Sequence, residues 1–298
     1  MDEFSVMASS LSCLASDQAR YHKIFQVFLD CSTEHQCMKE FILSTLPHVF
    51  TSIVQGKSSI NILGVGSGSG EMDLEMLSQL HQQYPGVTVD YEVVEPCSQM
   101  MGNYKALVSK TPNLEKINFT WNQMSSSEFE KHWKTKQSTK KMDFIHMIQM
   151  LYYVTDPDAT VSFFRSLLSE NGKLLIILVA GESGWGRLWA THCKELCNSE
   201  ISQCITTYNI KSYLDTIGVS YKSYLLPSTM DITECFFPGG EKGELLLDFL
   251  TEVSDFSKSA SPELKGRVLD SLQKPECSTV VDGRVIFNNT LEALIVEP

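Results

Sequence analysis

The chain has 298 residues, of which 43% are hydrophobic and 20% charged, a composition that predicts a sizeable folded core and argues against disorder. Its formal net charge of −12 would repel a phosphate backbone, so we expect no nucleic-acid partner. The absence of a long apolar run and of a secretory signal, together with nine scattered cysteines, predicts a cytoplasmic protein with no membrane contact.

Two helices are predicted before the first strand. Residues 1–16 are rich in serine, and we expect them to be poorly ordered unless the core or a ligand holds them. Residues 17–29 have a helical apolar face, and Ser32 or the threonine after it can cap a second helix that should end at Leu46, just before a proline. Glu34 would lie in the first turn of that helix, where a carboxylate favours the helix dipole; this is its purely structural interpretation.

A glycine cluster follows an apolar strand in the stretch 60–71, and a helical pattern begins at once behind it. Glycine lets the backbone come close to a ligand, and the helix start offers unpaired N–H groups. The next strand ends at Glu95, whose carboxylate can accept hydrogen bonds from a ribose diol. A later strand, 141–149, ends in Gln149. Glycines alone would also suit an ordinary tight turn, but the three features together resemble a class I S-adenosylmethionine (SAM) methyltransferase more than an NAD dehydrogenase.

Helices and strands continue to alternate as far as residue 179. Residues 131–141 are rich in lysine and are expected to form a solvated surface loop. A helix that begins at Asp156 should end near Asn171-Gly172, before a nearly continuous apolar strand at 173–179 that suits burial on both faces. This alternation predicts an α/β fold with a doubly wound, mostly parallel sheet.

The pattern changes after residue 180. Trp185 and Trp189 share one face of a predicted helix, where they either pack in the core or line a site for an aromatic or cationic ligand. Cys193 and Cys197 have a spacing that two zinc ligands could use, but a fourth ligand is missing and no metal site is predicted. Residues 228–283 contain no strand–helix–strand pattern, although helices are expected at 243–256 and from 261 onwards.

Several segments resemble the histamine N-methyltransferase family and span nearly the whole chain. The resemblance implies a SAM-dependent enzyme, cytosolic and monomeric, that methylates a ring nitrogen of histamine and thereby inactivates it. It also implies the class I methyltransferase fold, with a core at about 47–228 plus the strand 284–298. A smaller substrate-binding cap would come from 1–46, 181–206 and 229–283. The matching segments are 32–38, 84–87, 92–96, 143–154 (DFIHMIQMLYYV), 183–185, 228–232 and 287–291.

The resemblance also assigns residues to the two ligands. Met100 stands where the family usually has glutamine, with Gln99 beside it, so the adenosine contacts are expected to differ there. No general base is assigned, because a neutral imidazole nitrogen already carries its lone pair. The cofactor residues would be Gly66, Glu95, Met100, Ser126 and Ile148. The substrate residues would be Glu34, Gln149 and Asn289, with an aromatic wall of Tyr21, Phe25, Tyr152, Tyr153, Trp185, Trp189 and Phe249.

Three alternatives stay open at this point. The chain could be a related N-methyltransferase that acts on another imidazole or amine. It could be a SAM-binding or partner-binding protein without catalytic activity. An NAD dehydrogenase is the third, because the sheet would host it, although the sequence offers no hydride-transfer site.

Overall fold

The computed structural model describes residues 11–196 and 204–298, which form two compact units. Unit 1 takes the described parts of residues 1–35 and 179–206 together with 227–291, and unit 2 takes residues 36–178, 207–226 and 292–298. The boundaries differ from the expected core and cap in two stretches, because residues 36–46 belong to unit 2 and residues 284–291 to unit 1. The chain therefore crosses between the units several times.

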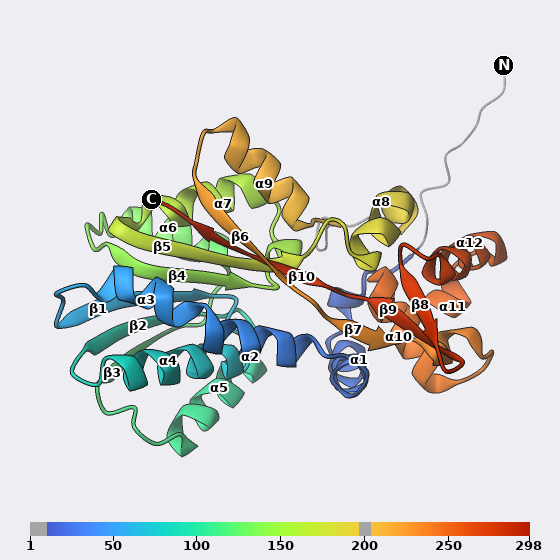
Figure 1. Cartoon of the computed structure of the whole chain (residues 1–298), viewed down its shortest axis with the longest axis horizontal. Helices are drawn as coiled ribbons and strands as arrows, with labels where there is room; N and C mark the ends of the chain where they lie inside the picture. The colour runs from blue at the N-terminus through green and yellow to red at the C-terminus, as the bar shows by residue number, and fades with distance from the viewer. Residues whose placement is uncertain (1–10, 197–203) are drawn as a thin grey trace. The chain divides into compact units, whose positions relative to one another are not determined.

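Unit 2 is built on a seven-stranded sheet in the order β3-β2-β1-β4-β5-β10-β6 (Figure 1). The pairs β1–β2, β1–β4, β2–β3 and β4–β5 are parallel, which confirms the doubly wound, mostly parallel α/β sheet. β4 and β10 are buried along almost their whole length, as strands covered on both faces must be. The strands are β1 (Ser59–Val65), β2 (Thr88–Val94), β3 (Ile117–Asn122), β4 (Met142–Ile148), β5 (Leu168–Val179), β6 (Tyr221–Leu226) and β10 (Leu291–Val296).

Helices cover both faces of this sheet. α3 packs on α4 and α4 on α5 along one face, whereas α7 packs between α6 and α9 on the other (Figure 1). The helices are α2 (Glu34–Ser44), α3 (Leu46–Val54), α4 (Glu71–Gln83), α5 (Ser98–Lys110), α6 (Ser126–Thr135), α7 (Pro157–Ser166) and α9 (Thr207–Thr216), with a short 3₁₀ helix, η2 (Leu151–Tyr153).

Three sequence-based expectations for unit 2 were wrong in their boundaries. The second helix ends at Ser44, and a separate helix, α3, begins at Leu46 because Pro47 suits the first turn of a helix, where its N–H is not needed. Part of the expected loop at 131–141 is helical, because α6 continues to Thr135 and buries Trp133. α7 ends at Ser166, and Asn171-Gly172 lies within β5, next to an irregularity in its pairing with β4.

Unit 1 combines a small antiparallel sheet with helices. Its strands lie in the order β7-β9-β8, and β8 was not predicted. The helix expected at 243–256 ends earlier, because Glu252 adopts a left-handed backbone conformation with φ of 57°. The elements are η1 (Leu14–Ser16), α1 (Gln18–Cys31), α8 (Gly184–Leu196), β7 (Thr229–Asp231), η3 (Thr233–Phe236), α10 (Glu241–Thr251), α11 (Phe256–Ser259), α12 (Pro262–Gln273), β8 (Ser278–Val281) and β9 (Arg284–Asn288).

The start of the described chain is held by the core of unit 1. Leu14 is fully buried, its N–H donates to the carbonyl of Glu252 at 2.9 Å, and Cys13 forms an isolated bridge with Val253. The exception stated in that expectation, that the core holds the segment, therefore applies to residues 11–16, while residues 1–10 lie outside the described part. Cys197, the second of the two spaced cysteines, also lies outside it.

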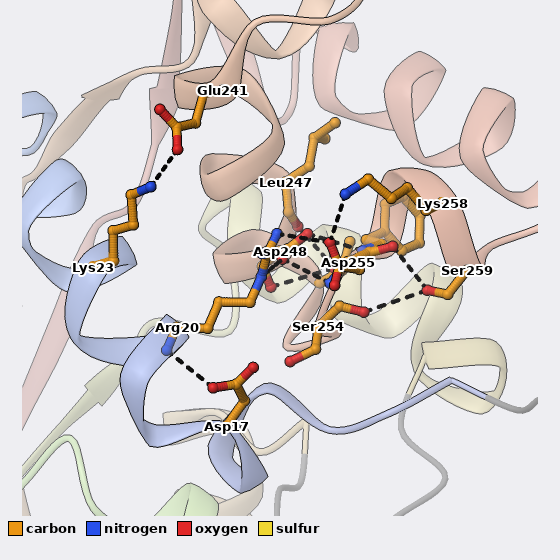
Figure 2. A network of polar contacts seen from close by, with 12 residues as sticks. Asp17, Arg20, Lys23, Glu241, Leu247, Asp248, Ser254, Asp255, Lys258 and Ser259 are labelled. Atoms are coloured by element: carbon orange, nitrogen blue, oxygen red, sulfur yellow. Dashed lines mark hydrogen bonds and ion pairs between the residues drawn. The ribbon is translucent and has the colours of Figure 1, made fainter.

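A buried carboxylate fixes α1 to α10 (Figure 2). Asp248 accepts hydrogen bonds from Arg20 Nε at 2.6 Å, from the Asp255 N–H at 2.8 Å and from the Phe256 N–H at 2.9 Å. Burial raises the pKa of Asp248, and these hydrogen bonds oppose that rise. Asp17 caps α1 by accepting from the Arg20 N–H. The backbone of Arg20 therefore contacts one carboxylate and its guanidinium group contacts another.

No helix in the described parts of the chain has both the length and the apolar character that crossing a bilayer would require.

Candidate functional site

The glycine loop after β1 has a backbone that only glycine adopts easily. Gly66, Gly68 and Gly70 have φ values of 68°, 56° and 79°. A Cβ added to Gly66 would lie 2.6 Å from the Cβ of Met150, so space as well as conformation requires glycine there. α4 begins directly behind Gly70, which places the positive end of a helix at the loop.

Glu95 follows β2 and is tied directly to this loop. Its side chain is only 7% exposed, and Oε2 accepts from the Gly68 N–H at 2.8 Å while Oε1 accepts from the Cys97 N–H at 2.9 Å. Burial raises the pKa of Glu95, and the two backbone hydrogen bonds oppose the rise. A carboxylate has about four acceptor positions, so each oxygen can accept a further hydroxyl donor such as a ribose O–H.

Two buried polar atoms at the carboxyl edge of the sheet have no hydrogen-bond partner among the described residues. They are Oγ of Ser67, within the loop, and Nδ2 of Asn122, the last residue of β3. Asn122 is a neighbour of Glu95, whose N–H donates to the Asn122 carbonyl at 3.1 Å. Since buried polar groups are normally satisfied, this edge suits a ligand rich in hydroxyl and nitrogen groups, as the adenosyl cofactor is.

Neither Ser67 nor Asn122 was among the predicted cofactor residues. Ser67 lies between loop glycines, and Asn122 ends a strand next to the strand that ends at Glu95. A sequence argument that followed every strand to its polar end would have found Asn122.

The remaining predicted cofactor residues lie on separate elements of unit 2. Ile148 is the last residue of β4, and Met100 is a half-buried residue in the first turn of α5. Three consecutive serines, 125–127, lie at the start of α6, and the first of them caps the helix. Ser125 accepts from the Glu128 N–H at 3.3 Å, and Glu128 accepts from the Ser125 N–H at 2.8 Å. Ser126 is half-buried at the first position of that helix, so Ser125 and not Ser126 makes the capping hydrogen bond.

Gln149 has a strained backbone at the end of β4. Its φ is 54°, a conformation that costs a non-glycine residue roughly 1–3 kcal/mol, and such strain clusters at functional sites. The Tyr152 hydroxyl donates to Oε1 of Gln149 at 2.6 Å and so orients its amide. β4 and β2 flank β1 on opposite sides, so Gln149 and the glycine loop lie at the point where the strand order reverses, where α/β sheets bind ligands.

Glu34 and Asn289 come together in unit 1. Glu34 is only 5% exposed, and Asn289 is fully buried. Nδ2 of Asn289 donates to Oγ of Ser32 at 2.8 Å and to Oε2 of Glu34 at 3.4 Å. Oδ1 of Asn289 is buried and, within residues 11–196 and 204–298, accepts no hydrogen bond. The Asn289 side chain therefore has an acceptor that can still take a hydrogen bond, and it lies beside the buried acid Glu34. A role of Glu34 as a first-turn acid would not require this arrangement.

The predicted aromatic residues of unit 1 form one cluster. Tyr21 stacks on Phe25 with 6.3 Å between ring centroids, and Phe249 lies 5.4 Å from Trp185. Nε1 of Trp185 and of Trp189 both donate to the Leu250 carbonyl, which accounts for their burial as core packing. Phe28, 4.7 Å from Phe249, also belongs to the cluster and was not predicted. Tyr152 and Tyr153 belong to unit 2, where their rings meet edge to face.

Comparisons with known proteins agree with this architecture. Residues 37–219 match the family model described as a methyltransferase domain. The chain is 61% identical to histamine N-methyltransferase of Danio rerio over 98% of its own length and 100% of that protein. It is 48% identical to the enzymes of Xenopus tropicalis and Mus musculus, over 98% of this chain and 99% of each relative.

Solved structures with low sequence identity share the fold. The YcgJ protein of Bacillus subtilis has a TM-score of 0.51 and 11% identity, covering 84% of this chain and 97% of that one. The plantazolicin methyltransferase BamL, solved with S-adenosylhomocysteine (SAH) and a substrate analogue, has a TM-score of 0.50 and 13% identity, covering 94% of this chain and 92% of that one.

Proposed function

The chain belongs to the histamine N-methyltransferase family, and we propose that it transfers the methyl group of SAM to a ring nitrogen of histamine, which inactivates histamine. Identity extends over nearly the full length of the relatives, so both the cofactor-binding and the substrate-binding parts are included. The structural observation that carries the substrate assignment is the buried, unsatisfied Oδ1 of Asn289 beside Glu34.

The cofactor is SAM, and residues of the glycine loop and its neighbours hold it. Glu95 accepts hydrogen bonds from the ribose hydroxyls, and Gly66 lets the backbone approach closely. Ser126, Ile148 and Met100 contact the adenosyl part. The sulfonium supplies an activated methyl group, so the protein needs to provide position rather than activation.

Asn289 and Glu34 recognise the two polar ends of histamine. The Oδ1 of Asn289 accepts the N–H of the neutral imidazole, which leaves the lone pair on the other ring nitrogen, the one that attacks. Glu34 pairs with the ammonium group of the side chain. Gln149, oriented by Tyr152, is a further polar contact to the ring.

The aromatic residues Tyr21, Phe25, Trp185, Trp189 and Phe249, with Tyr152 and Tyr153, exclude water and hold a cation by their π faces. Because the attacking nitrogen already carries its lone pair, no side chain has to remove a proton before the methyl group is transferred. Correct positioning of reacting atoms can lower a barrier by about 7–11 kcal/mol in favourable cases, so orientation is the main contribution of these residues.

We further propose that the enzyme acts as a monomer in the cytoplasm, without a nucleic-acid or membrane partner. The acidic net charge supports the absence of nucleic-acid binding. Cys13, Cys31, Cys97, Cys235 and Cys277 are free thiols, as a reducing compartment would leave them.

The test is a radiolabelled methyl-transfer assay with histamine, other imidazoles and simple amines as acceptors. We expect the highest kcat/KM with histamine and a product methylated on a ring nitrogen. Faster transfer to another imidazole would change the substrate assignment. SAM binding without transfer to any of these amines would contradict the proposed activity.

A further inference from the structure

Unit 2 contains a buried polar cluster that none of the roles above uses. It consists of Asp73 in α4, Tyr91 in β2, Tyr104 in α5 and His146 in β4. The Tyr91 hydroxyl donates to Oδ2 of Asp73 at 2.7 Å, and the Tyr104 hydroxyl donates to the same oxygen at 3.1 Å. Nε2 of His146 lies 2.6 Å from the Tyr91 hydroxyl. Four elements around the glycine loop therefore meet at one carboxylate.

The hydrogen bonds fix the direction of every donor in this cluster. The single Tyr91 hydroxyl hydrogen goes to Asp73, so the Tyr91 oxygen must accept from His146, whose Nε2 carries the hydrogen. Burial lowers the pKa of His146 and keeps the ring neutral, and it raises the pKa values of both tyrosines well above their usual range. The carboxylate of Asp73 is then the only formal charge in the cluster.

This charge is buried without a cationic partner. Asp73 is 2% exposed, and in the described chain no lysine or arginine forms an ion pair with it. Two hydroxyl donors and the first turn of α4 stabilise this charge, and together they are a smaller compensation than an ammonium or guanidinium group would give. A buried carboxylate held in this way would be stabilised further by a positive charge that arrives with a ligand.

The cluster lies directly beneath the cofactor loop. A Cβ added to Gly64, the penultimate residue of β1, would lie 2.8 Å from Nε2 of His146 and 2.9 Å from Oδ2 of Asp73, and it would also collide with Oγ of Ser67. A Cβ added to Gly70 would collide with the Tyr104 ring. Burial is the main cause of the raised pKa of Glu95, and the nearby Asp73 carboxyl raises that pKa slightly further.

We propose that the carboxylate of Asp73, held by Tyr91, Tyr104 and His146, is a specificity-determining group that favours the positively charged cofactor SAM over its neutral product SAH. The two ligands share the adenosine and the amino-acid part and differ by one methyl group and one positive charge at sulfur. Charges in a buried region act over longer distances than in water, so an anion beneath the loop stabilises the sulfonium without touching it.

This inference rests on SAM being the cofactor, and it goes beyond the transfer reaction. A buried anion shifts the ratio of the two affinities, and it does so whichever amine accepts the methyl group. Failure of histamine methylation would therefore leave this inference untouched, because its test measures binding alone.

The experiment compares the Kd values of SAM and SAH for the wild type and for Asp73→Asn by titration calorimetry. We expect SAM affinity to fall about tenfold while SAH affinity changes less than about threefold, so that their ratio shifts. Equal losses for both ligands would mean that Asp73 only shapes the loop, and unchanged affinities would mean that its charge does not reach the site. Either result overturns the proposal.

Two further variants keep the test decisive. Asp143→Asn removes another buried carboxylate of unit 2, at the start of β4, which accepts hydrogen bonds from Lys57, Asn61 and Ser169. This variant should leave the SAM-to-SAH ratio unchanged. Tyr91→Phe removes a hydroxyl but keeps the charge of Asp73. It should retain the preference for SAM, and a lost preference would overturn the proposal even if Asp73→Asn does not fold.

Discussion

Glu95 and Glu34 are nearly equally buried acids, but their hydrogen-bond partners lie at very different distances along the chain. Glu95 accepts from the Gly68 N–H, 27 positions before it, within one strand–loop–helix motif. Glu34 contacts Asn289, 255 positions later in the chain. The first acid is positioned by local backbone geometry, and the second by the completed tertiary structure of unit 1. We therefore expect local sequence patterns to predict contacts of the first kind, which we propose for the cofactor, but not contacts of the second kind, which we propose for the substrate.

Gly66→Val, in the loop that contacts Glu95, is expected to have the largest effect on SAM binding. Strain from φ of 68° and the collision with Met150 should lower SAM affinity by at least about a hundredfold, measured by calorimetry. Gly56→Val is the matched control, because Gly56 has a φ of 73° and nothing within 4 Å of an added Cβ. Wild-type SAM affinity in folded Gly66→Val would remove the loop from the cofactor site.

Glu95→Ala should come next. Loss of a charge-assisted acceptor at the ribose hydroxyls should weaken SAM binding by about 1.5–3 kcal/mol, with a smaller change in melting temperature. Calorimetric titration of SAM together with thermal unfolding measures both quantities. If the variant binds SAM as tightly as the wild type, Glu95 does not contact the cofactor.

Glu34→Gln tests the proposed contact between Glu34 and the substrate. The change removes the charge but keeps the shape, so kcat/KM for histamine should fall at least about tenfold, or roughly 1.4 kcal/mol, while SAM affinity is kept. As an ordinary first-turn acid, Glu34 would contribute only about 0.3–1 kcal/mol of stability. An efficiency within twofold of the wild type, with reduced stability alone, would make Glu34 a helix-start residue and nothing more.

The last prediction concerns a third acid, Glu252 in unit 1, and how it changes the stability of the fold with pH. Burial raises the pKa of Glu252 to about 8, so between its ordinary value of 4.5 and pH 8 the folded protein keeps a proton that the unfolded chain has released. This residue therefore lowers stability as pH rises through that range. Glu252→Gln should unfold at higher denaturant concentration than the wild type at pH 8 and at the same concentration below pH 4. An identical difference at both pH values would show that ionisation is not the cause.

The sequence predicted the elements of unit 2 well because its signals are local. Apolar runs, the glycine loop and the Asp156 cap each act within a few residues, and the structure has Asp156 accepting from the Ala159 N–H. One boundary was wrong: Asn171-Gly172 was expected to end a helix but lies within β5, beside the irregularity in its pairing with β4.

The parts that could not be predicted depend on contacts between distant residues. The single strand expected at 284–298 forms two strands in different sheets, β9 beside β7 and β10 in the large sheet, and β8, which has little alternation of its own, was not predicted. The cluster around Asp73 joins four elements, and no spacing in the sequence relates Tyr91 to His146. Asn289 entered the predicted site only through resemblance to a family, since nothing around it in sequence marks a buried acceptor.

The position of β10 bears on how the protein is made. Residues 291–296 are synthesised after every other strand of the large sheet, yet they occupy an interior place between β5 and β6. Until they leave the ribosome, β5 presents an open hydrogen-bonding edge and β6 has no neighbour, and open edges of this kind pair with other chains. A nascent chain of this protein therefore has its greatest need of chaperones before residues 291–296 have been added, and a frameshift near codon 290 would remove an interior strand of the sheet.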